Sequence, residues 1–193
     1  MRIFLAGATG VIGVRLVPLM LAEGHVIAGM TRTPAKTDGL RVAGVNPVLC
    51  DVFDQMSLTA AVKDFRPDLI VHQLTDLPDE IEKLADFLPA NSRVRSDGTR
   101  NLLAAARAAN TSGFLAQSVA FFSDAVIEAH ENGVISAGGT VLRYGLLYGP
   151  GTWYENDTPP APRIHVDDAA RRTMPFLNGP RGIFTITDEE VAS

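Results

Sequence analysis

The chain has 193 residues, of which 46% are hydrophobic and 20% charged, a composition ordinary for a globular domain with a sizeable core. A formal net charge of −5 argues against nucleic-acid binding through a basic surface. No apolar run is long enough to cross a bilayer, and the first residues predict a strand rather than a signal peptide. Cys50 is the only cysteine, which excludes an internal disulfide and favours a cytoplasmic protein.

Apolar strand-like runs alternate with helical patterns along most of the chain. Strands are predicted over residues 3–6, 26–30, 47–50, 69–72, 114–117, 141–147 and 183–186. Helices are predicted over residues 11–23, 58–65, 81–109, 125–132 and 166–177. Such alternation indicates parallel strands joined by right-handed crossovers and covered by helices on both faces. The sequence therefore predicts a doubly wound parallel sheet, a three-layer α/β/α Rossmann fold, as a single domain over residues 1–193.

The long helical region contains a proline. Pro89 is expected to break or begin a helix there, and Asn91 or Ser92 to cap a helix that runs to Ala109.

Three glycines connect the first predicted strand to the first predicted helix. We expect Gly7 to allow a tight turn, Gly10 to let a phosphate approach the backbone, and Gly13 to let the helix pack close to the sheet. The helix N-terminus adds free N–H groups and the positive end of a dipole. The pattern predicts binding of a dinucleotide diphosphate; the alternative is a loop that uses its glycines only for turning.

The residues after the second predicted strand bear on which dinucleotide binds. An acidic side chain there grips the ribose 2′-hydroxyl of NAD, but this chain has Thr31, Arg32 and Lys36. A guanidinium binds a 2′-phosphate that a carboxylate would repel. We therefore predict NADP(H) over NAD(H), with a solvated Arg32 as the alternative. After the third strand, Asp51, which precedes Val52, either contacts the adenine or caps the following turn.

Four separated motifs cover most of the chain: GATGVIG at 7–13, GTRNLLAAA at 98–106, LRYGLLYGPG at 142–151 and IHVDDAA at 164–170. In their order and spacing they resemble the NAD-dependent epimerase/dehydratase family of extended and atypical short-chain dehydrogenases/reductases. The first motif is shared by many Rossmann proteins, whereas the last two together are specific. The resemblance implies an epimerase, dehydratase or reductase acting on a small hydroxyl- or carbonyl-bearing substrate, such as a nucleotide sugar.

The resemblance also implies roles for particular residues. The diphosphate would be lined by Gly7, Thr9, Gly10, Val11, Ile12 and Gly13. The adenosine ribose and phosphates would lie against Gln73, Leu74 and Thr75, and the nicotinamide would be bordered by residues 145–148, including Leu147 and Tyr148. Ser118 would hydrogen-bond the reacting carbonyl or hydroxyl.

One part of the family pattern is missing. The family's reaction normally depends on a Tyr-x-x-x-Lys pair after the serine, in which the lysine lowers the pKa of the proton-shuttling tyrosine. No tyrosine here has a lysine four residues later, and Lys83 is the last lysine. Arg95 replaces an asparagine often found before the second motif. The routes after Ser118 and from Trp153 to Arg163 are short, so the substrate-binding portion, about residues 150–193, is expected to be reduced.

Three interpretations stay open. The chain is an atypical member that uses other chemistry or none, as a dinucleotide sensor or scaffold would; or the catalytic segments lie outside the given sequence; or it is a relative of flavin or quinone reductases. We expect no metal site, because the histidines have no partner ligands at useful spacing. A homodimer through residues 91–109 and 125–132 is also expected.

Several other side chains allow two interpretations of their role. Arg143 forms a structural ion pair or contacts a substrate phosphate. Trp153 forms an aromatic wall over the substrate or anchors its loop. Asp76 belongs to an acidic group after the fourth strand that is expected to face solvent or cap a turn. His165 is expected to pack at the start of a helix capped by Asp167 or the residue after it.

Overall fold

The apolar runs of the sequence form parallel strands in the computed structural model, which describes residues 1–188. The strands are β1 (Arg2–Ala6), β2 (Val26–Thr31), β3 (Asn46–Leu49), β4 (Leu69–His72), β5 (Gly113–Val119), β6 (Thr140–Tyr144), β7 (Leu146–Tyr148), β8 (Arg163–His165) and β9 (Gly182–Ile186). One seven-stranded sheet has the order β3-β2-β1-β4-β5-β6-β9, and all of its pairs are parallel. The remaining strands, β7 and β8, pair with each other. The predicted doubly wound sheet is confirmed.

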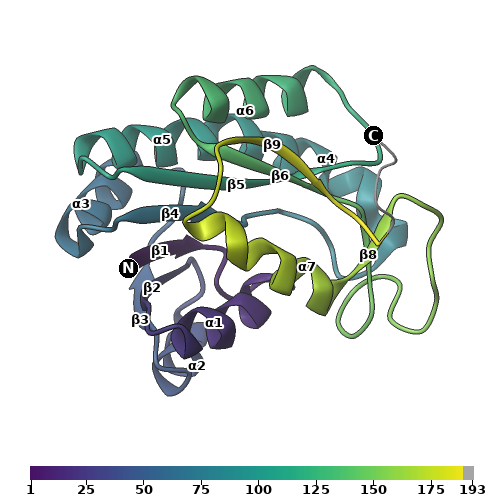
Figure 1. Cartoon of the computed structure of the whole chain (residues 1–193), viewed down its shortest axis with the longest axis horizontal. Coiled ribbons are helices and arrows are strands. Elements are labelled where there is room, and N and C mark those ends of the chain that lie inside the picture. The colour runs from purple at the N-terminus through teal and green to yellow at the C-terminus, as the bar shows by residue number, and fades with distance from the viewer. Residues whose placement is uncertain (189–193) are drawn as a thin grey trace.

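Helices cover both faces of the sheet. They are α1 (Gly13–Ala22), α2 (Thr37–Val42), α3 (Gln55–Phe65), α4 (Leu84–Arg93), α5 (Thr99–Ala108), α6 (Ala125–Ser136) and α7 (Val166–Thr173). Short 3-10 turns span Pro34–Lys36, Ile81–Lys83 and Met174–Leu177, and a π-helical turn spans Val94–Gly98. Figure 1 shows α1, α2 and α7 on one side of the sheet and α4, α5 and α6 on the other.

The alternation of side chains along β1 explains this layering. Ile3 and Leu5 belong to the apolar cluster that includes Leu16 of α1, whereas Phe4 and Ala6 belong to the cluster of α3 and α5. All four strand residues are fully buried. Successive side chains of a strand point to opposite faces, so β1 supplies both layers of the core.

Two expected elements differ from the structure. The strand predicted over 141–147 divides at Gly145, where a Cβ atom would lie 2.7 Å from the Arg163 backbone; only a glycine lets β8 approach so closely. The helical region 81–109 was expected to break or begin at Pro89, with Asn91 or Ser92 as the cap of the helix that follows. That prediction was wrong, because Pro89 lies inside α4, where it removes one ladder hydrogen bond, and the irregularity falls instead at the π-helical turn.

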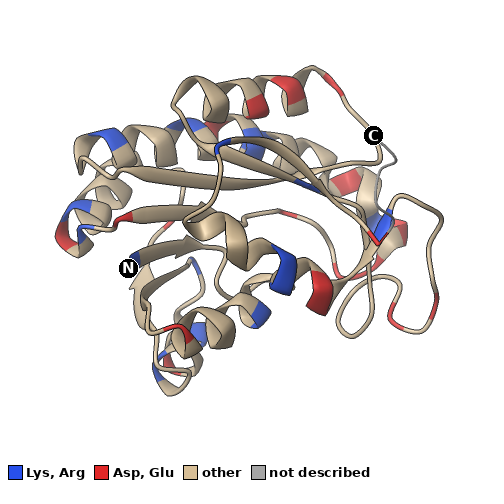
Figure 2. Cartoon of the chain, in the orientation of Figure 1, with Lys and Arg blue, Asp and Glu red and all other residues tan. Residues whose placement is uncertain are grey.

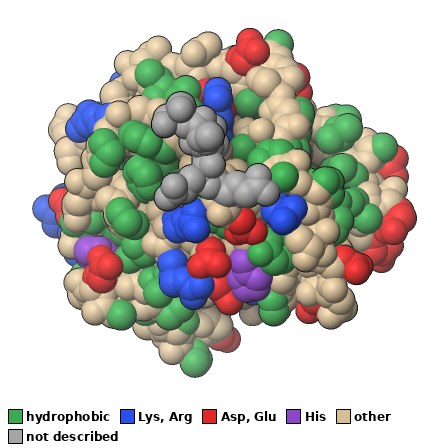
Figure 3. All heavy atoms as spheres, turned by 45° about the vertical axis from the view of Figure 1, so that its right-hand side comes forward, with side chains coloured by type: hydrophobic (Ala, Val, Ile, Leu, Met, Phe, Trp, Pro, Cys, Tyr) green, Lys and Arg blue, Asp and Glu red, His purple; other side chains and the backbone are tan. Residues whose placement is uncertain are grey.

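Charged groups are mixed over the surface. Figure 2 shows lysine and arginine spread over elements on both sides of the sheet, and in Figure 3 basic and acidic side chains lie next to one another in the middle of the face turned forward. Among the described helices, none combines the length and the apolar character that a membrane span requires.

Candidate functional site

Two hollows open at the edge of the sheet where the strands end. The first, which we call the glycine-loop cleft, has a volume of about 660 Å³ and is walled by residues that follow β1, β2, β3 and β4. The second, the Arg143 cavity, has a volume of about 890 Å³ and lies between the ends of β5, β6 and β9 and the start of α6. In open α/β sheets, ligands bind in crevices outside the carboxyl ends of the strands.

The turn between β1 and α1 is built as its glycines predict. Gly7 has φ of 97°, and a Cβ atom there would lie 2.7 Å from the Gln73 backbone. A Cβ atom at Gly13 would come within 2.0 Å of the Gly7 carbonyl oxygen, so only glycine lets α1 begin this close to the strand. The turn is closed by the Gly10 N–H, which donates to the same carbonyl at 3.0 Å. Gly7 and Gly10 therefore line the cleft without side chains, and Gly13 lets α1 begin directly behind them.

Most residues predicted to bind the cofactor line this one cleft. They are Gly7, Thr9, Gly10, Val11, Thr31, Arg32, Lys36, Asp51, Val52, Gln73, Leu74 and Thr75. Ile12 and Gly13 are buried behind the turn. Leu147 and Tyr148 line neither hollow: the Tyr148 hydroxyl donates to Asp188 at 2.8 Å.

Two side chains with alternative expected roles, Asp51 and Trp153, make the structural contact, and both also line the glycine-loop cleft. Asp51 lines the cleft, and its carboxylate accepts from the Phe53 N–H at 2.9 Å, which caps the turn. Trp153 also lines the cleft, and its indole N–H donates to the Pro78 carbonyl at 2.9 Å, which anchors the loop. Asp76 does not simply face solvent, since it pairs with Arg32 at 3.0 Å.

The start of α7 is held by a different group from the one expected. The His165 ring nitrogen Nδ1 accepts from the Asp167 N–H at 3.3 Å, so the histidine itself caps the helix. Its ring packs edge-on against Tyr148, with 5.2 Å between ring centroids. Asp167 is thereby free to pair with Arg15 of α1 at 2.6 Å.

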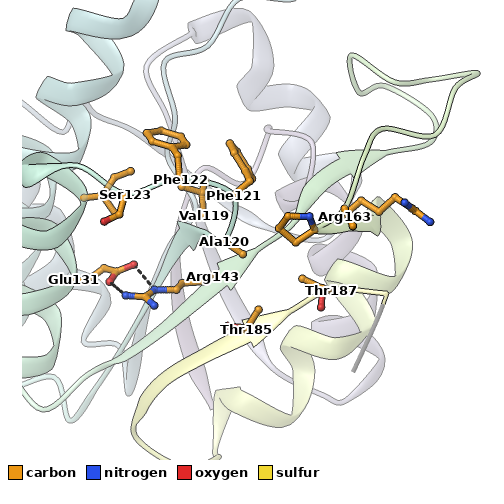
Figure 4. A pocket seen from close by; sticks show the side chains of 13 residues that line it. Val119, Ala120, Phe121, Phe122, Ser123, Glu131, Arg143, Arg163, Thr185 and Thr187 are labelled. Atoms are coloured by element: carbon orange, nitrogen blue, oxygen red, sulfur yellow. Dashed lines mark hydrogen bonds and ion pairs between the residues drawn. The ribbon is translucent and has the colours of Figure 1, made fainter. Parts of the chain in front are cut away.

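An ion pair forms part of the wall of the Arg143 cavity (Figure 4). Arg143 Nε lies 2.9 Å from Glu131 Oε1, and its Nη2 lies 2.5 Å from Oε2. Burial acts to raise the pKa of Glu131, but the hydrogen bonds from Arg143 and Ser118 outweigh it and hold that pKa below its ordinary value. The rings of Phe121 and Phe122, 5.3 Å apart, line the same cavity. The structural ion pair expected of Arg143 is present, and Arg143 also faces the cavity.

Ser118, the predicted catalytic serine, lies behind this ion pair. It is fully buried, and its hydroxyl donates to Glu131 Oε1 at 2.6 Å. Val119 and Ala120, which follow it, line the cavity. Glu131 was not found from the sequence: its signal was an acid on the predicted helix after the serine, and its partner Arg143 lies on the strand that follows that helix.

None of the tyrosines with a shifted pKa is activated as a base. Burial raises the pKa of Tyr144 to about 12, and the hydroxyl of this residue contacts Thr173 Oγ1 at 2.5 Å. The hydrogen bond to Asp188 raises the pKa of Tyr148. Within residues 1–188, no three or more histidine, cysteine or acidic side chains gather as metal ligands would.

A buried hydrogen-bond chain runs from the Gln117 carbonyl of β5 to the wall of the glycine-loop cleft. His130 Nε2 lies 3.0 Å from the Gln117 carbonyl and so donates to it. Burial lowers the pKa of both His130 and His72 and keeps the rings neutral. The His130 Nδ1 atom then accepts from the Thr99 hydroxyl at 2.8 Å, and this hydroxyl accepts from His72 Nε2 at 3.0 Å. His72 Nδ1 accepts from the Leu74 N–H at 3.3 Å, which fixes one wall of the glycine-loop cleft.

Arg95 occupies the position where the resemblance leads one to expect asparagine. Arg95 is only 5% exposed, and its Nη1 atom is buried with no hydrogen-bond partner among the described residues. Its charge contributes to lowering the pKa of His72 and His130. The π-helical turn places this guanidinium inward.

A parallel sheet with a glycine turn at the end of β1, one of its inner strands, defines a Rossmann-type α/β protein. More specifically, the chain belongs to the NAD dependent epimerase/dehydratase family, whose model matches residues 3–134. The family and fold predicted from the motifs are thus confirmed. The family supports an NAD-dependent enzyme of the epimerase or reductase type.

Two curated relatives carry different activities in their names. A Streptomyces protein named 3-diazoavenalumate denitrifying reductase is 32% identical over 240 aligned positions, which cover 100% of this chain and 77% of the reductase. Because the alignment has more positions than this chain has residues, the reductase carries segments without a counterpart here. UDP-glucose 4-epimerase of Mycolicibacterium smegmatis is 31% identical over 114 positions, 56% of this chain and 36% of the epimerase.

Solved structures share the fold at low identity. UDP-glucose 4-epimerase of Thermus thermophilus, in complex with NAD, has a TM-score of 0.78 at 21% identity, over 98% of this chain and 78% of that one. WbmH of Bordetella bronchiseptica, in complex with NAD+, has a TM-score of 0.74 at 18% identity, over 98% and 76%.

Proposed function

We propose that this chain binds NADP(H) in the glycine-loop cleft and acts as a reductase on a small substrate held in the Arg143 cavity. One observation carries the proposal: two hollows share the carboxyl edge of one sheet, and the first contains the glycine turn together with a basic strand end. Bound there, the nicotinamide would supply a hydride.

The turn at the start of α1 fits a diphosphate because Gly7 and Gly13 allow its tight backbone path, which a Cβ atom at either position would block, and Gly10 lines the cleft without a side chain. Arg32 and Lys36 of the same cleft would hold a 2′-phosphate, which favours NADP(H) over NAD(H). Asp51 and Val52 would lie beside the adenine, and residues 73–75 beside the ribose.

A reduction suits these residues better than an epimerisation. An epimerase must first remove a proton from a substrate hydroxyl, which requires a base of lowered pKa. Tyr144 and Tyr148 have raised pKa values instead. A reductase takes up a proton, and an uncharged hydroxyl or solvent can deliver it. The whole-chain match to a protein named as a reductase supports the same choice.

The Arg143 cavity favours a small, partly apolar substrate with a carbonyl or other electrophilic group. Phe121, Phe122 and Ile127 provide apolar wall. Because Arg143 uses Nε and Nη2 on Glu131, its Nη1 group is left to donate to a substrate oxygen. We assign Ser118 the role of hydrogen-bonding the reacting oxygen, which requires its hydroxyl to turn away from Glu131.

The test is consumption of NADPH, followed by its absorbance, with aldehydes, ketones, quinones, diazo compounds and UDP-sugars. We expect turnover with a reducible compound and none with the sugars, and S118A should lower kcat by about a hundredfold, as loss of an oxygen-binding donor does. Epimerisation of a UDP-sugar would contradict the reductase assignment. Binding of NADPH without turnover of any compound would favour the sensor or scaffold alternative.

A further inference from the structure

An ion pair spans the glycine-loop cleft above the end of β1. Arg32 follows β2 and Asp76 follows β4, and in the sheet these strands flank β1. The Arg32 Nη2 atom lies 3.0 Å from Asp76 Oδ1, and Nη1 lies 3.4 Å from Oδ2. Both residues line the cleft. The pair therefore crosses the opening through which an adenosine ribose would reach the glycine turn.

The carboxylate is the fixed partner of this pair. The side chain of Asp76 is 18% exposed, whereas that of Arg32 is 61% exposed. The backbone N–H of Asp76 donates to Asn91 Oδ1 of α4 at 3.1 Å, which ties the loop to a helix. Two residues further on, Pro78 accepts from the Trp153 indole at 2.9 Å. A long, exposed arginine can change its partner at low cost, while Asp76 stays in place.

We propose that Asp76 is a specificity-determining residue for the dinucleotide: it occupies Arg32 before binding and competes with a 2′-phosphate for the same guanidinium. This inference rests on the proposed binding of NADP(H). The sequence has no acid directly after β2, but the loop after β4 supplies one that already occupies the guanidinium a 2′-phosphate would need. The chain accordingly binds NADP(H) with a smaller advantage over NAD(H) than Arg32 alone would give.

The test is the variant Asp76→Asn, which keeps an oxygen acceptor but removes the charge. Binding of NADPH and NADH is measured by titration calorimetry, together with the fragments adenosine 2′,5′-bisphosphate and AMP. We expect D76N to bind NADPH and the bisphosphate about threefold to tenfold more tightly than the wild type does. This range is what loss of one exposed ion pair should give when the released arginine binds a doubly charged phosphate. NADH and AMP should change by less than about twofold.

Two further variants show whether the effect passes through Arg32. Asp38→Asn removes a carboxylate from another exposed arginine pair, Asp38–Arg41, which lies outside the cleft, and should leave the NADPH to NADH ratio unchanged. In an Arg32→Ala background, the gain from D76N should disappear. A full gain in that background, or a D76N protein with unchanged or weaker NADPH binding, would overturn the inference. If neither dinucleotide binds the wild-type protein, the proposed function fails as well; if both bind and the ratio does not respond, only the role of Asp76 fails.

Discussion

Thr99→Val is the substitution that most sharply separates the buried hydrogen-bond chain from ordinary packing. Valine keeps the shape of threonine but removes the hydroxyl that accepts from His72 Nε2 and donates to His130 Nδ1. Both imidazoles are buried, so neither can turn to solvent for a new partner. The substitution therefore leaves one donor and one acceptor unsatisfied inside the protein.

The expected cost follows from those two groups. An unsatisfied buried donor or acceptor costs about 1–3 kcal/mol, so T99V, which leaves two such groups, should lower the free energy of unfolding by about 2–6 kcal/mol. That is a large part of the stability of an ordinary domain, about 5–15 kcal/mol. Thr99→Ser is the matched control: it keeps the hydroxyl, loses one methyl group and should cost about 1 kcal/mol.

Urea unfolding, followed by circular dichroism, measures both variants. Because His72 also holds the Leu74 N–H on the wall of the glycine-loop cleft, T99V should weaken NADPH binding more than T99S does. A T99V protein as stable as the wild type, or a T99S protein destabilised equally, would refute the hydrogen-bond assignment.

Three further predictions concern other parts of the chain. Gly13→Ala should cost about 2 kcal/mol or more in unfolding free energy, because its Cβ meets the Gly7 carbonyl oxygen at 2.0 Å; in the matched control G39A, where no atom lies within 4 Å, urea midpoints should not fall. The pKa values of His72 and His130 are lowered in the folded state, so below about pH 6.5 the unfolded chain binds more protons than the folded one. The free energy of unfolding should therefore fall as the pH falls below about 6.5, by up to about 1.4 kcal/mol per pH unit for each ring. A free energy of unfolding that does not change with pH in this range would contradict the neutral rings. Burial raises the pKa of the Cys50 thiol to about 11. At mildly alkaline pH, Cys50 should therefore be alkylated far more slowly in the folded protein than in the unfolded chain, as measured by mass spectrometry. Equal rates would contradict its burial.

The local parts of the fold could be predicted from the sequence. The β1–turn–α1 unit is set by neighbouring residues, since strand burial, glycine spacing and an amphipathic helix act within one short segment. For the same reason the order of strands and helices followed from periodicity. The position of Arg32 at the cleft also followed, because the end of β2 is fixed by the sheet.

The features that the sequence did not predict depend on contacts between distant residues. Asp76 reaches Arg32 because β2 and β4 flank β1, although 44 positions separate the two residues. Glu131 of α6 pairs with Arg143 on the following strand, β6, a contact that helix periodicity alone does not reveal. The π-helical turn that carries Arg95 inward arises where α5 packs beside α3 and α6, and no local residue preference announces it.

Binding of NADPH at the glycine turn can be measured directly by fluorescence. Trp153 is the chain's only tryptophan and lines the cleft, so its emission reports a reduced nicotinamide dinucleotide bound nearby. We expect a saturable loss of Trp153 emission as NADPH is added, with the affinity for NADPH lowered at least about tenfold in G13A and unchanged in G39A. An emission that does not respond to NADPH, or a G13A protein that binds as tightly as the wild type, would contradict binding at the glycine turn.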